Sequence, residues 1–181
     1  ILFLSKSFTV ESAIQPQILN LVEESYCQNA APIELQSNLD DVIFQGQGIS
    51  ENLDGGFTFY PDAVEPGLIT ITCNSYSENV GSSSPEQDVN ILVTPAVMFE
   101  LSTECIPEGG EKVSFINQTD GRPSIESWSW NFGDEGSGED NISDLPSPSH
   151  QYQEPGAKSI SLTATTYSGC VSHFVLETII D

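Results

Sequence analysis

The stretch WSWNFGDEGSGEDN, residues 128–141, changes from a strand pattern to a turn pattern within a few positions. Its large rings, Trp128, Trp130 and Phe132, alternate with polar residues, and a period of two is typical of a strand that is buried on one face. Glycines and carboxylates follow, and such residues end strands. The stretch therefore predicts a core strand that is followed by an acidic loop.

Short alternating runs of the same kind recur along the whole chain, and no sustained helical period competes with them. Their apolar members are Phe8 and Val10; Ile69, Ile71 and Cys73; Val89, Ile91 and Val93; Val113 and Phe115; and Ile160, Leu162 and Ala164. Clusters of Gly, Pro, Asn and Ser separate the runs, as in antiparallel sandwiches. The sequence thus predicts an all-β fold.

An internal repeat divides the chain. Residues 8–27 and 89–105 each read as a strand, a proline, a second apolar stretch and a cysteine. A proline fixes φ and removes a backbone donor, so each joint is expected to be short. We predict a terminal strand of a preceding repeat at 1–15, one sandwich at 16–94 and a second at 95–181.

The four cysteines are Cys27, Cys73, Cys105 and Cys170. None lies in a C-x-x-C motif, so zinc spacing is absent, and an even number of distant cysteines favours disulfides and an oxidising location. Of the three possible connectivities, only Cys27–Cys73 with Cys105–Cys170 keeps each bond within one repeat. We expect that pairing.

The charge balance of the chain argues against two classes of binding partner. The chain has 27 Asp and Glu residues against four Lys and Arg, a net charge of −23. So few cations argue against nucleic acid and against anionic membrane surfaces as partners. No signal peptide is visible, and the opening ILFL is too short for a membrane span.

The acidic loop is a candidate calcium site, because calcium takes oxygen ligands from a glycine-bent loop. Asp134, Glu135 and Asp140 are the expected ligands, although their spacing is not that of an EF-hand. The alternative is a solvated loop tip without an ion. No cofactor is required by any motif, and calcium is the one candidate.

Catalytic motifs are absent from the sequence. Its two histidines, His150 and His173, fall in strand patterns, no G-x-S-x-G is present, and no glycine-rich phosphate loop opens a helix. We therefore expect a protein that is not an enzyme.

The second half resembles the PKD domain, an Ig-like sandwich found on bacterial and animal surfaces. The matching residues are Trp130, Asn131, Phe132, Gly133 and Asp134, then Pro148, His150 and Tyr152, then Pro155 and Gly156. The cysteine framing is similar to PKD variants in secreted proteins of Bacteroidetes. The first half resembles, more weakly, another Ig-like module of such proteins, through residues 26–35, 44–50 and 57–73.

The resemblance implies two tandem sandwiches in a large extracellular bacterial surface protein. Within them, Trp130 is expected to fill the core, Gly133 to adopt a positive φ, Asp134 to accept backbone N–H bonds, and His150 to be structural. The segment would act as a rigid spacer or an adhesive module, with neighbouring repeats, other copies of the chain or a host or prey ligand as partners.

Two alternatives stay open. The chain could be an accessory module of a secreted hydrolase that binds a polysaccharide or protein, which needs exposed coplanar rings. The candidate rings are Phe57, Phe59, Tyr60, Tyr76 and Trp128, the last beside Tyr167. The second alternative is self-assembly, in which strands 1–15 or 173–181 pair with neighbouring molecules.

Overall fold

The computed structural model describes residues 14–75, 85–102, 112–120 and 123–180. Within them the chain forms antiparallel β-strands and two short 3₁₀ helices, which confirms the all-β prediction. It divides into two compact units, and each has its own sheets and its own hydrophobic core. No helix among the described residues is long and apolar enough to cross a bilayer.

The first unit comprises Ala30–Ile91 and the residues up to Tyr26. One of its sheets has the order β1 (Ser25–Cys27), β7 (Glu86–Leu92), β6 (Gly67–Ser75), β3 (Val42–Gln45), and the other has the order β2 (Ile33–Leu35), β5 (Phe57–Phe59), β4 (Ile49–Glu51). A 3₁₀ turn, Pro61–Ala63, follows β5. The alternation expected in residues 69–73 is confirmed, because Ile69, Ile71 and Cys73 are buried in the core.

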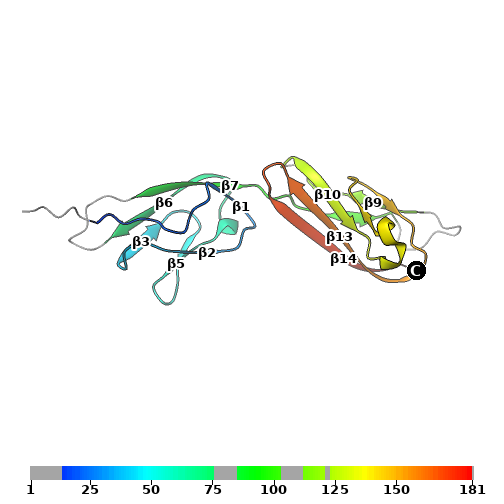
Figure 1. Ribbon diagram of the computed structural model, residues 1–181, viewed down its shortest axis with the longest axis horizontal. Helices are drawn as coiled ribbons and strands as arrows, with labels where there is room; N and C mark the ends of the chain where they lie inside the picture. Colours follow the sequence, from blue (N-terminus) through cyan, green and yellow to red (C-terminus); the bar gives the residue numbers. More distant parts are fainter. Residues whose placement is uncertain (1–13, 76–84, 103–111, 121–122, 181) are drawn as a thin grey trace, which may run out of the picture. The chain divides into compact units, whose positions relative to one another are not determined.

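The second unit comprises Leu92–Asp181 and the short segment Cys27–Asn29. Its four-stranded sheet has the order β11 (Ile142–Ser143), β10 (Ile125–Asn131), β13 (Gly156–Thr166), β14 (Val171–Ile180), and the last three strands lie side by side in Figure 1. The facing sheet has the order β12 (Ser149–His150), β9 (Val113–Asn117), β8 (Phe99–Leu101). The 3₁₀ helix Glu135–Asn141, which is kinked by non-helical backbone at Gly138 (φ 63°, ψ −124°), joins β10 to β11, where the sequence predicted only a loop.

Trp130 is the largest side chain in the second core and is 1% exposed. Its ring packs edge-on against Phe99, at 4.9 Å between centroids, and its indole N–H donates to the carbonyl of Leu145 over 2.9 Å. A buried indole needs such an acceptor, because an unpaired polar group in a core is costly. The expected role of Trp130 as the core filler is confirmed.

The expected disulfide pairing is wrong. Cys27 bonds to Cys170, with 5.6 Å between their Cα atoms, and Cys73 is a buried free thiol. Strand β7 lies between β1, which carries Cys27, and β6, which carries Cys73. Strands two places apart are about 9.6 Å from each other, beyond the Cα separation of about 7 Å that a disulfide spans. Cys105 lies outside the described residues.

The segment that carries Cys27 explains the actual partner. Residues Cys27–Asn29 belong to the second unit, where the side-chain amide of Asn29 donates to the carbonyl of Val171 over 2.8 Å. Cys170 lies in the turn between β13 and β14, directly before Val171. The disulfide therefore closes at the start of β14 and spans 143 residues of sequence.

The domain boundaries differ in detail from the predicted ones. The first unit ends at residue 91 and the second begins at residue 92, rather than at 94 and 95. Cys27–Asn29 belongs to the second unit, whereas the residues before and after it belong to the first. Residues 1–13 of the expected N-terminal strand lie outside the described part. The two joint prolines, Pro16 and Pro95, are both buried.

Candidate functional site

The polar centre of the second unit is the carboxylate of Asp134, which follows the end of β10. Its Oδ2 lies 2.9 Å from Nε2 of His150 in β12, and its Oδ1 accepts a 2.9 Å hydrogen bond from Nζ of Lys158 in β13. All three side chains are almost fully withdrawn from solvent. Because β12 and β13 belong to opposite sheets, Asp134 connects the two layers of the sandwich.

Opposing effects act on the charge of this carboxylate. Burial alone raises the pKa of Asp134, but the hydrogen bonds and positive charges of Lys158 and His150 outweigh it and hold the pKa below its ordinary value. Burial, together with the Asp134 charge, raises the pKa of the Tyr152 phenol. The Asp134 carboxylate is therefore ionised at neutral pH.

Aromatic rings enclose the polar centre. The imidazole of His150 stacks on Phe132 with 4.6 Å between centroids and meets the edge of Tyr152 at the same distance. The Tyr152 hydroxyl donates to the carbonyl of Phe132, and Lys158 Nζ lies 5.1 Å from the Tyr152 ring centroid. The histidine is thus structural, as expected, because its polar and apolar surfaces both pack inside the fold.

The backbone between Phe132 and Asp134 needs a glycine. Gly133 has a φ of 67°, and a Cβ there would lie 2.5 Å from the carbonyl oxygen of Ser159. Left-handed backbone is unfavourable for other residues, and the neighbouring β13 backbone cannot yield as a flexible side chain could. The expected positive φ of Gly133 is confirmed, and the close strand contact adds a second reason for glycine.

Replacement of Gly133 by alanine is expected to destabilise the second unit by roughly 2–5 kcal/mol, from the backbone penalty plus overpacking. Gly169→Ala has a positive φ of 86° but open space, and Gly136→Ala has open space without the positive φ. Gly169→Ala should therefore lower the free energy of unfolding less than Gly133→Ala does, and Gly136→Ala should lower it least. Urea unfolding followed by tryptophan fluorescence measures the series, and equal losses for Gly133 and Gly169 would rule out the strand contact.

The 3₁₀ helix is fixed by asparagines rather than by Asp134. Asn141 Oδ1 accepts the N–H of Asp134 over 2.6 Å, and Asn131 Oδ1 accepts the N–H of Gly133 over 2.8 Å. The expectation that the Asp134 side chain accepts backbone N–H bonds in this turn is therefore wrong. Its oxygens are bound by Lys158 and His150, which leaves the turn to the two amides.

The three expected calcium ligands are not brought together. Asp134 is buried, Glu135 lines one depression beside it, and Asp140 is exposed and lines another. No three Asp, Glu, His or Cys side chains in the described ranges form a group that could hold a metal. Calcium binding stays a prediction, and bound calcium would raise the thermal midpoint relative to a sample with chelator.

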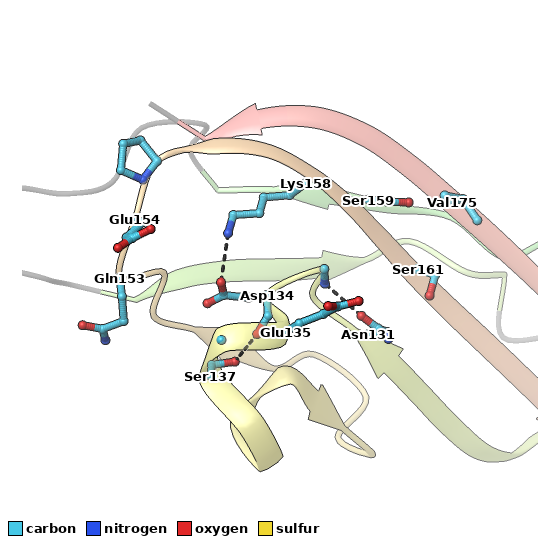
Figure 2. Close-up of a pocket in the computed structure, with 13 residues that line it drawn as sticks. Asn131, Asp134, Glu135, Ser137, Gln153, Glu154, Lys158, Ser159, Ser161 and Val175 are labelled. Atoms are coloured by element: carbon cyan, nitrogen blue, oxygen red, sulfur yellow. Dashed lines mark hydrogen bonds and ion pairs between the residues drawn. The ribbon is translucent and has the colours of Figure 1, made fainter.

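An open depression of about 830 Å³ lies on the outer face beside the polar centre (Figure 2). Polar side chains from β10, the 3₁₀ helix, the 153–155 turn and β13 line it, among them Asn131, Glu135, Glu154 and Ser161. Lys158 points from β13 toward Asp134, so its charge is already paired (Figure 2). Such a surface can hydrogen-bond a polar ligand, but no aromatic ring is among its described lining residues.

The rings expected to form a carbohydrate platform do not gather on the surface. Phe59 is fully buried, Phe57 and Tyr60 are half-buried, and Tyr76 lies outside the described residues. Trp128 is half-buried against the second core, whereas Tyr167 is 73% exposed in the β13–β14 turn. The exposed pair of Trp128 and Tyr167 that would favour polysaccharide binding is not present.

Two residues of the polar centre were missed in the sequence, Lys158 and Asn141. Lys158 carried an available signal, because it is one of only four Lys and Arg residues and precedes an alternating strand run. A scarce cation beside a fold signature is a candidate partner for the acid of that signature. Asn141 carried no such signal, since polar loops commonly contain asparagine.

Comparison with known proteins places this signature in a family. The family model described as PKD domain matches residues 93–178. No curated protein matches the chain.

Among solved structures, the PKD1 domain of Vibrio anguillarum Epp is similar with 27% identity and a TM-score of 0.41 over 49% of this chain and 94% of that one. The PKD1 domain from the Vibrio cholerae metalloprotease PrtV shares 26% identity with a TM-score of 0.40, over 49% of this chain and 98% of that one. The fibronectin(III)-like modules of Clostridium thermocellum CbhA share 14% identity with a TM-score of 0.38, over 92% of this chain and 93% of that one.

Proposed function

Residues 93–178 are a PKD domain, and from that premise we propose that the chain is a spacer segment of a large extracellular bacterial surface protein. PKD and Ig-like domains are non-catalytic modules that serve as structural or binding units. In this proposal the two sandwiches hold a distance between other parts of the parent protein, and the oxidising cell exterior maintains the disulfide.

The disulfide is the observation that carries the proposal. A pull between points before Cys27 and after Cys170 is transmitted through the sulfur–sulfur bond once the terminal segments are taut. The residues between the two cysteines, which are 143 positions apart in the sequence, then bear none of the tension. A segment built in this way can lengthen only by the parts before Cys27 and after Cys170, so its extension under load is limited, which is what a spacer requires.

The polar centre supports the same function. Asp134, Lys158 and His150 are all engaged with one another, and they connect the two sheets of the PKD domain. Buried polar groups that hydrogen-bond to one another stabilise a fold, and the atoms in those bonds are not free to bind a substrate. The polar centre thus stabilises the folded domain by binding its two layers together, while the disulfide carries the load.

The alternative function is an accessory substrate-binding module, and the polar depression beside Asp134 is the feature that favours it. Affinity electrophoresis through gels that contain soluble polysaccharides distinguishes the two functions. A spacer should migrate at the same relative rate in every gel. Retardation in one of them, lost in the Glu154→Ala/Ser161→Ala variant, would support the binding module instead.

A further inference from the structure

Strand β14 is an unusual edge. It has ten residues, Val171–Ile180, and among the described strands it pairs only with β13. Every other edge strand in the described residues has two to four residues. Natural proteins protect long edges with charged residues, proline or a bulge. The sequence VSHFVLETII contains no proline or lysine, Glu177 is its one carboxylate, and its register with β13 is continuous.

The direction of the backbone groups follows from the hairpin. The N–H of Thr166 donates to the carbonyl of Cys170 over 2.9 Å, so these two residues form a hydrogen-bonded pair. Hydrogen-bonded pairs alternate along an antiparallel ladder. The backbone N–H and C=O groups of even-numbered β14 residues therefore point toward β13, and those of odd-numbered residues point away from it. The carbonyl of Val171 fits this rule, because it accepts the side-chain amide of Asn29.

We propose that two copies of the chain pair through β14, antiparallel, about a two-fold axis at Val175. The outward N–H and C=O groups of His173, Val175 and Glu177 then bind their counterparts and join two four-stranded sheets. The proposal goes beyond the spacer function, because a spacer can hold distance as a single chain. Failure of the pairing would leave the spacer proposal intact.

The side chains of β14 complement themselves in this register. On the outer face, each His173 lies opposite Glu177 of the other copy. Glu177 Oε1 accepts the Ser159 hydroxyl of its own chain over 2.6 Å, and its Oε2 can accept an imidazole N–H from the other copy. On the same face Val175 meets its own copy and Val171 meets Ile179, and these apolar side chains are 45%, 47% and 60% exposed in the single chain. Phe174 and Leu176, which are half-buried against the second core, are covered by β14 of the other copy in this pairing.

Neighbouring registers lack this complementarity. An axis at Glu177 would place two carboxylates opposite each other, and an axis at His173 would place two imidazoles opposite each other. Two carboxylates directly opposite each other across a ladder are destabilising, and in the His173 register no imidazole lies opposite a carboxylate. The Val175 register is therefore selected by the outward side chains as well as by the backbone.

The net charge of −23 opposes any pairing of identical chains. Salt screens this long-range repulsion much more than it weakens hydrogen bonds in contact, since the screening length is about 4 Å at roughly 0.5 M salt. We therefore expect the dimer fraction to rise with salt as well as with protein concentration. This salt dependence is opposite in sign to that of a dimer held by attraction between charged patches.

Sedimentation equilibrium of the full chain tests the pairing. Dimers should form in about 0.5 M NaCl and be fewer in low salt. Val175→Pro should abolish them, because it removes the central outward N–H while the bonds to β13 stay. Val175→Thr keeps the N–H and the β-branched shape, so it should still dimerise. Monomers under every condition, or dimers that survive Val175→Pro, would overturn the proposal.

A charge exchange tests the register. His173→Glu places two acids opposite each other twice in the dimer, so dimerisation should weaken by about 5- to 30-fold. The double variant His173→Glu/Glu177→His has the composition of the natural chain and should recover most of the lost affinity. If the double variant stays as weak as the single one, residue 173 does not face residue 177 of the other copy.

Discussion

A chain pulled from both ends is expected to extend about 500 Å further when the Cys27–Cys170 disulfide is reduced than when it is intact. The bond spans 143 residues, and each residue contributes about 3.3–3.6 Å when fully extended. In the oxidised chain only the segments before Cys27 and after Cys170 can be drawn out. The measurement therefore tests the spacer function directly, because a segment that yields its full length under oxidising conditions cannot hold a distance.

Optical tweezers with handles at the two ends, with and without a thiol reductant, give both extensions. The variant Cys27→Ser/Cys170→Ser should show the long extension without reductant. The matched control is Cys73→Ala, since Cys73 is a buried free thiol and its loss should leave the oxidised length unchanged. A longer oxidised chain in Cys73→Ala would mean that Cys73 is bonded after all, as the repeat alone suggested.

The strands of this fold could be predicted from local patterns. A period of two in residues 69–73 and 160–164 marks which side chains enter a core, and that property depends on neighbouring positions alone. All six apolar residues of those runs are buried. The two cores also follow from the repeat, because each repeat carries enough alternating strands for a sandwich.

The disulfide could not be predicted in the same way. Its partners depend on strand order, and the placement of β7 between β1 and β6 is a long-range pairing that no short pattern records. The repeat favoured bonds within one module, but Cys27–Asn29 packs with the second unit. The same limit applies to Asp134, whose partners Lys158 and His150 come from two other strands.

Asp134→Asn is expected to destabilise the PKD domain by about 3–5 kcal/mol at neutral pH. It leaves the Lys158 ammonium and the His150 ring in a buried site without the carboxylate that binds both, and removal of one member of a buried ion pair has this effect. Both tryptophans of the chain lie in this domain, so their fluorescence during urea unfolding reports it separately from the first unit. The matched control is Glu135→Gln, which removes an exposed charge from the next residue and should change stability by less than about 0.5 kcal/mol.

The pH dependence separates the ion pair from packing. The pKa of Asp134 is lower in the folded chain than its ordinary value of 3.8, so its stabilising contribution is present above that value and is lost as pH falls through the folded pKa. The free-energy difference between the natural chain and Asp134→Asn should therefore shrink below about pH 4. Acid also relieves the repulsion of a net charge of −23, which changes both proteins alike and cancels in the difference. A difference that stays constant through this range would show that the amide disrupts packing, and that the charge of Asp134 does not connect the two sheets.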